Sequence, residues 1–295
     1  MLILTNANAG THDTETLERI AALLREGGRD VALRPTGSPE DLDRALDEHP
    51  AGGSGDVVVA AGGDGSIHGL VARLRARGEL GERTVGLLPM GTGNDLARNL
   101  GIPLDPERAA RLLADGTPRE LDLLVDEDGG VVLNAVHVGI GAVAARRAAR
   151  FKPYLKAAAF SLGAILSGMR ETGWNLRVQA DGESVADGRF LMVALSNASG
   201  IAGGTAQLAA DGHPGDGRAE LVVSAATGPF ARVGFALRLR EGTHRHREDV
   251  VHTTACSVTI SGEPFLANAD GEVSGPYTHR CWTLDARAWR IIAPG

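Results

Sequence analysis

The first third of the chain alternates between two spacings of apolar residues, which predict alternating strands and helices. Apolar residues recur at helical spacing at Leu17, Ile20 and Leu24. Ser38 followed by Pro39 predicts the start of another helix, because serine caps a helix and proline suits its first position. The predicted strands are the apolar runs Leu2–Leu4, Val31–Leu33, Val57–Ala61 and Val85–Leu88. Short connections between such elements indicate a doubly wound α/β domain with a parallel sheet.

Beyond Asp122 the pattern changes to strand-like runs separated by glycine and aspartate turns. We therefore expect an α/β domain over residues 1–122 and a β-sandwich domain over residues 123–295. About the last 15 residues, around the strand-like run Trp282–Ile292, could pack back on the first domain. The other predicted strands are Val131–Val138, Gly188–Leu195, Ala219–Val223 and Cys256–Ile260, and helical spacing is found near Ala142–Ser167 and Phe230–Arg240.

Composition and charge narrow the class of protein. The chain has 295 residues and a formal net charge of −7, which argues against broad nucleic-acid binding because such binding needs a basic surface. No run reaches the ~18 apolar residues of a membrane span, and the N-terminus lacks the basic leader of a signal peptide. Cys256 and Cys281 match no zinc or redox spacing and are interpreted as buried thiols. We expect a cytoplasmic protein, at most peripheral at the inner membrane surface.

A glycine-rich turn with one carboxylate follows the most apolar predicted strand. Glycines in GGDGS allow the backbone to approach an anion closely, and the following helix start attracts negative charge. Asp64 would repel a bare polyphosphate, so its presence suggests that a divalent cation lies between the two. The alternative is a tight turn whose aspartate only caps the helix.

The segment GTGND, from Gly91 to Asp95, repeats this arrangement after the next predicted strand. It again combines glycines with a hydroxyl, at Thr92, and an acid. Ligands of doubly wound sheets bind beyond the carboxyl ends of the strands, where both turns fall. The chain has no GxxxxGK[ST] segment, so a P-loop NTPase is excluded, and GGDG does not match the GxGxxG fingerprint of dinucleotide sites.

These segments resemble the diacylglycerol kinase catalytic-domain family, which includes bacterial diacylglycerol kinase-like lipid kinases and sphingosine kinases and is more distantly related to NAD kinases. The resemblance covers nearly the whole chain in order. It rests on TNANAG, GGDGS, PMGTGNDLAR, the long segment NASGIAGGTAQLAADGHPGDGRAELVV and the closing NADGE. GTGNDLAR favours the lipid-kinase branch over the NAD kinases.

The resemblance implies that ATP lies in a cleft between an α/β domain and a β-sandwich. Asp64, Asp95 and Asp122 would form the acidic network that holds a catalytic Mg²⁺. By position, the nucleotide site would be lined by Asn6, Ala7, Asn8, Ala9, Gly10, Thr36, Gly63, Asp64, Gly65, Ser66, Ile67, His68, Gly69, Gly91, Thr92 and Asn94.

The resemblance also implies the residues of phosphoryl transfer. Glu272 would be the general base for the acceptor hydroxyl, with Asp270 assisting, and their i, i+2 spacing puts both on one side of an extended segment. Asp216, with the carbonyl groups of His213 and Arg218, would bind a second, structural Mg²⁺. Taken alone, each of these segments is more often an ordinary turn.

Two positions depart from the family's pattern: Ser66 stands in place of a more usual threonine, and His68 with Gly69 replaces a common Asn-Glu pair. The expected function is an ATP- and Mg²⁺-dependent lipid kinase acting on diacylglycerol or a related lipid at a membrane surface. A non-catalytic nucleotide or lipid sensor and an NAD kinase-like enzyme with a soluble substrate are the alternatives. A homodimer is left open, and the sequence does not identify the acceptor.

Two further segments allow more than one interpretation. The basic run Arg146–Lys156 could contact anionic lipid headgroups, although a solvated helix end is the more common occurrence. The run THRHREDVVH, with His244, His246 and His252, is interpreted as a solvated loop rather than a metal site.

Overall fold

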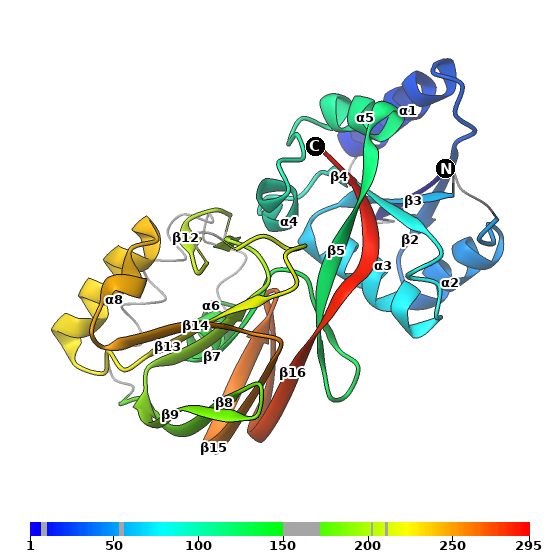
Figure 1. Cartoon of the computed structure of the whole chain (residues 1–295). Helices are drawn as coiled ribbons and strands as arrows, with labels where there is room; N and C mark the ends of the chain where they lie inside the picture. The colour runs from blue at the N-terminus through cyan, green and yellow to red at the C-terminus, as the bar shows by residue number, and fades with distance from the viewer. Residues whose placement is uncertain (7–10, 53–55, 150–171, 202, 210–211) are drawn as a thin grey trace. The chain divides into compact units, whose positions relative to one another are not determined.

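The computed structural model describes residues 1–6, 11–52, 56–149, 172–201, 203–209 and 212–295 (Figure 1). The chain divides into two compact units, which are described separately. The first unit comprises Met1–Leu121 with Arg287–Gly295, and the second comprises Asp122–Ala286. The strands β5 (Thr117–Asp126) and β16 (Glu272–Ala293) pass from one unit into the other along the chain.

The first unit is built on a parallel sheet in the order β2-β1-β3-β4, and the end of β16 adds to β4. Its inner strands β1, β3 and β4 are mainly apolar because helices cover both faces, whereas the edge strand β2 is only partly buried. Figure 1 shows α1 and α5 on one face of this sheet and α2 and α3 on the other. The elements are β1 Leu2–Asn6, α1 Thr11–Glu26, β2 Ala32–Thr36, α2 Pro39–Asp47, β3 Val57–Gly62, α3 Asp64–Ala76, β4 Thr84–Pro89, α4 Asp95–Asn99 and α5 Pro106–Asp115.

The helix starts of this unit follow the signals in the sequence. The hydroxyl of Ser38 accepts a hydrogen bond from the backbone N–H of Asp41, and Pro39 is the first residue of α2. The carboxylate of Asp105 caps α5 in the same way, through the N–H of Arg108. These caps satisfy N–H groups that have no partner inside the helix.

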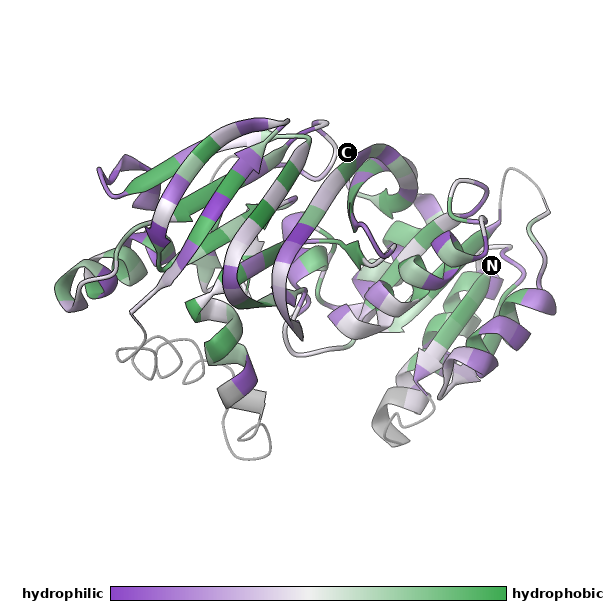
Figure 2. Ribbon diagram, turned by 90° about the horizontal axis from the view of Figure 1, so that it is seen from below, coloured by the Kyte–Doolittle hydropathy of each residue, from purple (hydrophilic) through white to green (hydrophobic). Residues whose placement is uncertain are grey.

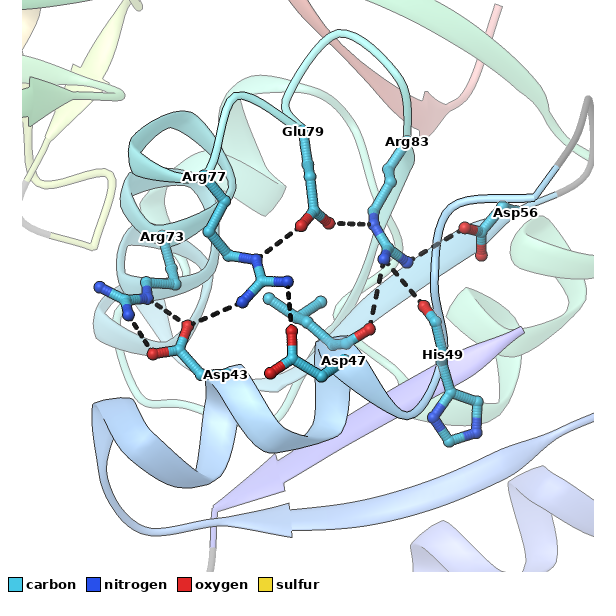
Figure 3. A network of polar contacts seen from close by, with 9 residues as sticks. Asp43, Asp47, His49, Asp56, Arg73, Arg77, Glu79 and Arg83 are labelled. Carbon is cyan, nitrogen blue, oxygen red and sulfur yellow. Dashed lines mark hydrogen bonds and ion pairs between the residues drawn. The ribbon is translucent and has the colours of Figure 1, made fainter.

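A network of arginines and acids holds the first unit together where β3 and β4 begin (Figure 3). Arg83 is only 1% exposed, and its guanidinium donates to Glu79, Asp56 and the carbonyl of His49, at 2.8, 3.0 and 2.8 Å. Arg77 continues the network by donating to Glu79. The remaining contacts join α2 to α3: Arg77 also donates to Asp43 and Asp47, and Arg73 donates to Asp43. Burial of this guanidinium is tolerated because two carboxylates balance its charge and its N–H groups are hydrogen-bonded.

The second unit is a β-sandwich in which β15 belongs to both layers. Its first half pairs with β8, and after a register shift its second half pairs with β7. One layer has the order β14-β13-β10-β7-β15, and the other contains β9, β8, β15 and β16. The elements are β6 Val131–Val132, β7 Ala135–Gly139, α6 Ile140–Ala149, β8 Trp174–Ala180, β9 Glu183–Phe190, β10 Met192–Ser196, β11 Gly200–Ile201, β12 Ala206–Gln207, β13 Ala219–Ser224, α8 Pro229–Glu241, β14 Val250–Ala255 and β15 Ser257–Ala269, with a 3₁₀ turn at His244–His246.

The core of the sandwich lies between these two layers. Val138, Val193 and Leu221 face it from one layer, and Val178 and Trp282 face it from the other. Figure 2 shows polar and apolar positions alternating along the strands of the sandwich. This alternation is what a strand with one buried face requires.

Several boundaries differ from the sequence predictions. The predicted strand Val131–Val138 is two strands, β6 and β7, because the N–H groups of Leu133 and Asn134 bond to the carboxylate of Asp270 instead of to a neighbouring strand. The predicted helix Ala142–Ser167 is described only as α6, and its remainder lies outside the described residues, as does most of the basic run Arg146–Lys156.

The interpretation of both cysteines as buried thiols is wrong. Cys256 is exposed and Cys281 is partly exposed. The alternation of β16 explains the second case, because it turns Trp282 into the core and the neighbouring Cys281 to the other face. In the described part of the chain, no helix is both long enough and apolar enough to cross a bilayer.

Candidate functional site

The parallel register brings the ends of four strands of the first unit to one edge of its sheet. Asn6 at the end of β1 pairs with Thr36 at the end of β2, and Gly62 at the end of β3 pairs with Pro89 at the end of β4. The hydroxyl of Thr36 donates to the carbonyl of Thr5 at 3.1 Å, which fixes its position at this edge. Ala7, Asn8, Ala9 and Gly10 lie outside the described residues.

The first glycine-rich turn leads directly into α3. A side chain at Gly62 would collide with Ser66, since a Cβ there would lie 2.2 Å from the Ser66 hydroxyl oxygen. Gly63 is the N-cap of the helix and has no side chain to cover the helix end, and Asp64 is the first helical residue. Gly65 and Gly69 are exposed, whereas Ile67 is buried in the core, so any contact of Ile67 with a ligand is limited to its backbone.

The second glycine-rich turn is shaped by Asn94. This residue adopts a left-handed conformation with φ of 52° and is only 7% exposed. Its amide nitrogen donates to the carbonyl of Gly91 at 2.7 Å, and its amide oxygen accepts from the N–H of Gly91 at 3.1 Å. Asn94 therefore closes the turn, while Thr92 at its tip is exposed.

The two turns interlock. The N–H of Met90 donates to the carbonyl of Gly62 at 2.9 Å. One carboxylate oxygen of Asp64 accepts from the N–H of Leu96 at 3.3 Å. The other oxygen faces Gly93, where an added Cβ would lie 2.8 Å away. The carboxylate is thus held between the turns at the carboxyl edge of the sheet.

A cavity of about 470 Å³ adjoins the second turn on the side of α1 and α5. Gly91, Thr92 and Asn94 line it, together with Arg19 and Arg98. The guanidinium of Arg98 donates through Nε to the carbonyl of Gly93 at 3.0 Å, so one arginine of the cavity is positioned by the turn itself. The first unit thus offers an open, partly basic space beside its glycine-rich turns.

The segment containing Asp270 and Glu272 is a tight turn between β15 and β16, so the expectation of an extended segment is wrong. Asp270 has a φ of 47° and Gly271 a φ of 96°. The carboxylate of Asp270 accepts backbone N–H bonds from Leu133, Asn134 and Ala135 at 2.5, 2.9 and 3.1 Å. Glu272 is exposed at the start of β16.

Asp122 is buried at 1% exposure and is tied to the turn His213–Arg218 of the same unit. Its carboxylate accepts from the N–H of Gly217 at 2.7 Å. Within that turn the carbonyl of His213 accepts from Asp216, and the carboxylate of Asp216 accepts from Arg218. The structure therefore brings Asp122 next to the predicted residues His213, Asp216 and Arg218.

These groups do not form a compact cluster of ligands. Across the described residues there is no group of three or more histidine, cysteine, aspartate or glutamate side chains arranged to hold a metal ion. Any bound cation would therefore take part of its coordination from carbonyls, water or a ligand's own oxygens.

The sequence matches two family descriptions that together cover most of the chain. Residues 1–125 match the diacylglycerol kinase catalytic domain, and residues 134–292 match the YegS C-terminal NAD kinase beta sandwich-like domain. The chain belongs to the diacylglycerol kinase catalytic-domain family. Membership of a kinase family implies the use of ATP.

Named relatives agree with this family. The chain is 36% identical over 210 residues to a probable lipid kinase YegS-like from Pseudomonas aeruginosa, covering 69% of this chain and 65% of that protein. It is 28% identical to a probable lipid kinase YegS-like from Stenotrophomonas maltophilia, covering 92% and 88%. A crystal structure of a diacylglycerol kinase from Bacillus anthracis strain Sterne has a TM-score of 0.77 at 19% identity, covering 99% and 96%, which shows a shared fold.

Two polar side chains in the second unit of this diacylglycerol kinase family member escaped the sequence analysis. His137 on β7 pairs with Asn268 on β15. In the described part of the chain, neither Nδ1 of His137 nor Oδ1 of Asn268 has a hydrogen-bond partner. Burial lowers the pKa of His137 to about 4. The only signals in the sequence were a lone histidine in an apolar run and the asparagine of NADGE.

The histidine-rich segment is not a solvated loop. His244 is 1% exposed and its ring meets that of Phe235 edge-to-face, with centroids 5.9 Å apart. His246 is exposed, and His252 pairs with Glu220 across β14 and β13. The apolar partner of His244 is Phe235, nine positions earlier in α8, and the charged residues along the segment give no sign of this contact.

Proposed function

We propose that this chain is an ATP- and Mg²⁺-dependent lipid kinase that transfers the γ-phosphate to a hydroxyl group of diacylglycerol or a related lipid. The observation that carries the proposal is the interlock of two glycine-rich turns around the carboxylate of Asp64, in a member of a kinase family. Relatives named as probable lipid kinases support the lipid acceptor.

The phosphates would bind where β3 gives way to α3. The start of a 13-residue helix presents N–H groups and the positive end of its dipole, and Gly63 leaves that end uncovered. The exposed hydroxyl of Thr92 lies on the neighbouring turn, and Asn6 and Thr36 extend the same edge. These groups would position the phosphates and stabilise their negative charge. Positioning and charge stabilisation are the main requirements of phosphoryl transfer.

The carboxylates at this edge suit Mg²⁺. Among the described residues, one oxygen of Asp64 accepts from Leu96, and the oxygen beside Gly93 makes no hydrogen bond. This oxygen and Asp95 would hold the ion on the first unit. The family resemblance adds Asp122, whose carboxylate accepts from Gly217 within the second unit. When bound, Mg²⁺ supplies charge neutralisation of the phosphate oxygens. Asp216 and the carbonyls of His213 and Arg218 are a hard-oxygen donor set for a second ion.

Glu272 is the residue we assign as general base. Its carboxylate is exposed and makes no hydrogen bond within the described residues, so it can accept the proton of an acceptor hydroxyl. Asp270 is different, because three backbone N–H groups occupy its oxygens. We therefore assign Asp270 the role of a positioning residue, which fixes the turn that presents Glu272.

The test is transfer of labelled γ-phosphate from ATP to extracted lipids. Wild type should label a lipid in the presence of Mg²⁺ and lose this activity in EDTA, and Glu272→Gln and Asp64→Asn should label it at least about 100-fold more slowly. NAD is assayed beside the lipids. If only NAD is labelled, the acceptor is NAD and not a lipid. If calorimetry detects ATP binding but no phosphate is transferred, the protein is a sensor and not a kinase. Equal transfer by wild type and Glu272→Gln would remove Glu272 from the mechanism.

A further inference from the structure

The helix α8 of the second unit has apolar residues on two faces. One face carries Phe235 and Leu239, which pack into a buried cluster with Val222 and Val250 of the sheet. Figure 1 shows the helix lying beside β13 and β14. A helix needs only one apolar face to pack on a sheet, so the second face requires its own explanation.

The second face is formed by Phe230, Val233 and Leu237. Their spacing of three and then four residues places them in one stripe. They are 92%, 45% and 54% exposed. Among the described residues only five large apolar side chains are exposed, and this helix carries three of them. Scattered exposed apolar residues are ordinary, whereas a stripe on one helix marks an interaction surface. We call these three residues the α8 stripe.

Arginines border the α8 stripe. Arg238 and Arg240 are exposed on the last turns of the helix and make no ion pair within the described residues. The segment Pro229–Arg247 contains five arginines and one glutamate, in a chain whose net charge is −7. Of these arginines, Arg232 is buried and Arg247 pairs with Asp249, so Arg238 and Arg240 supply the exposed positive charge beside the α8 stripe.

The apolar stripe and the arginines beside it together indicate which kind of partner this surface binds. In a symmetric contact between two copies through the α8 stripe, the arginines of one copy would face those of the other, which costs free energy. Three side chains also cover far less than the roughly 800 Å² per partner of a stable protein interface. An anionic bilayer presents negative headgroups above an apolar interior, so it matches both the arginines and the stripe.

We propose that α8 docks this protein on anionic lipid bilayers, with Phe230, Val233 and Leu237 inserted among the headgroups and Arg238 and Arg240 contacting lipid phosphates. This inference rests on the proposed function in one respect: a kinase whose acceptor is a bilayer lipid must reach the bilayer surface. The residues involved take no part in the phosphate or base sites described above.

The test is sedimentation with vesicles of phosphatidylcholine, with and without phosphatidylglycerol. Wild type should bind the anionic vesicles at least about ten-fold more tightly than the neutral ones. The double variant Phe230→Ser, Leu237→Ser should bind them at least about ten-fold more weakly than wild type. Arg238→Gln with Arg240→Gln should weaken binding about 30-fold at low salt, and less at high salt.

The matched control is Val251→Ser. Val251 is 41% exposed on the edge strand β14, where it is paired with the core residue Val223 and so lies on the face of the sheet away from α8. This variant should bind vesicles like wild type. The substituted side chains are exposed, and unchanged melting temperatures would show that the variants are folded. Wild-type binding by the Phe230, Leu237 double variant, or no vesicle binding by wild type, would overturn the proposal.

Two further measurements separate this proposal from the others. Phosphate transfer to a short-chain diacylglycerol dispersed in detergent should be equal in wild type and all α8 variants, because no bilayer is needed there. If neither wild type nor any variant transfers phosphate but the vesicle-binding results are as predicted, the kinase proposal fails and the docking proposal stands. If Phe230→Ser, Leu237→Ser instead turns a wild-type dimer into a monomer in sedimentation velocity, a second copy covers the stripe and the bilayer assignment is wrong.

Discussion

Gly63 and Gly91 are in direct backbone contact: a Cβ atom on Gly91 would lie 2.4 Å from the Cα atom of Gly63. The atoms in contact belong to the backbone, so they cannot move aside as the end of a flexible side chain could. The close approach of the two turns therefore depends on the absence of side chains at both positions.

The substitution Gly91→Ala should separate the turns. We expect a loss of about 1–3 kcal/mol in the free energy of unfolding, as for overpacking elsewhere, together with weaker ATP binding. Urea unfolding and calorimetry measure the two effects. Gly81→Ala is the control, since nothing lies within 4 Å of a Cβ there and its φ is not positive, and it should change neither quantity. Equal behaviour of the two variants would show that the contact between the turns is dispensable.

Asp270 and Glu272 should respond differently to neutral substitution. Asp270→Asn removes the charge that three N–H groups share, so the free energy of unfolding should fall by roughly 2–4 kcal/mol. Glu272→Gln changes an exposed side chain, so the free energy of unfolding should stay within about 0.5 kcal/mol of wild type while transfer slows at least about 100-fold. Denaturant curves beside the kinase assay separate the roles. A strongly destabilised Glu272→Gln would contradict this division.

Arg83 should be the most costly exchange in the network of Figure 3. Arg83→Met leaves Glu79 and Asp56 without their buried partner, so we expect roughly 3–5 kcal/mol of destabilisation. Arg44→Met breaks an ion pair whose arginine is 68% exposed and should cost at most about 0.5 kcal/mol. Thermal or urea unfolding of both variants gives the comparison. Similar losses in the two would mean that the burial of Arg83 contributes nothing.

Stability should fall in mild acid because of two buried histidines. Burial lowers the pKa of both His137 and His244 to about 4, whereas histidine in an unfolded chain titrates near 6.5. The fold favours the neutral ring, so this contribution to stability is fully present above pH 6.5 and is lost as the pH falls from 6.5 toward 4.

Unfolding free energies between pH 4.5 and 8 measure this dependence. His244→Gln should flatten the slope below pH 6.5, because the side chain no longer takes up a proton on unfolding. His246→Gln, at an exposed position two residues away, should leave the slope unchanged. A wild-type slope in the His244 variant would assign the acid sensitivity to other groups.

Local patterns were sufficient to predict most of the first unit. The run Val57–Ala61 is β3 and Ser38 caps α2, because strand burial and helix capping depend on neighbouring residues only. The carboxyl-edge location of the two turns also followed, since parallel strands end together. The resemblance to a known family supplied the β-sandwich more surely than the strand pattern did.

The parts that were missed depend on residues far apart in the chain. The break at Leu133 is caused by Asp270, and the burial of His244 depends on Phe235. Their partners lie across a sheet or on another element, so no spacing rule within a single segment reveals them. The unpartnered polar atoms of His137 and Asn268 belong to the same class, because pairing between β7 and β15 brings them together.

Because β16 completes the sheet of the first unit, that sheet cannot form fully until β16 has been synthesised. Arg290 and Ile291 of β16 pair with Thr84 and Val85 of β4, although the ribosome makes these partners about two hundred residues apart. A nascent chain that has already exposed residues 1–121 still has one side of β4 open. The sheet of the first unit is therefore complete only after β16 has been translated, and the whole second unit is translated before that point.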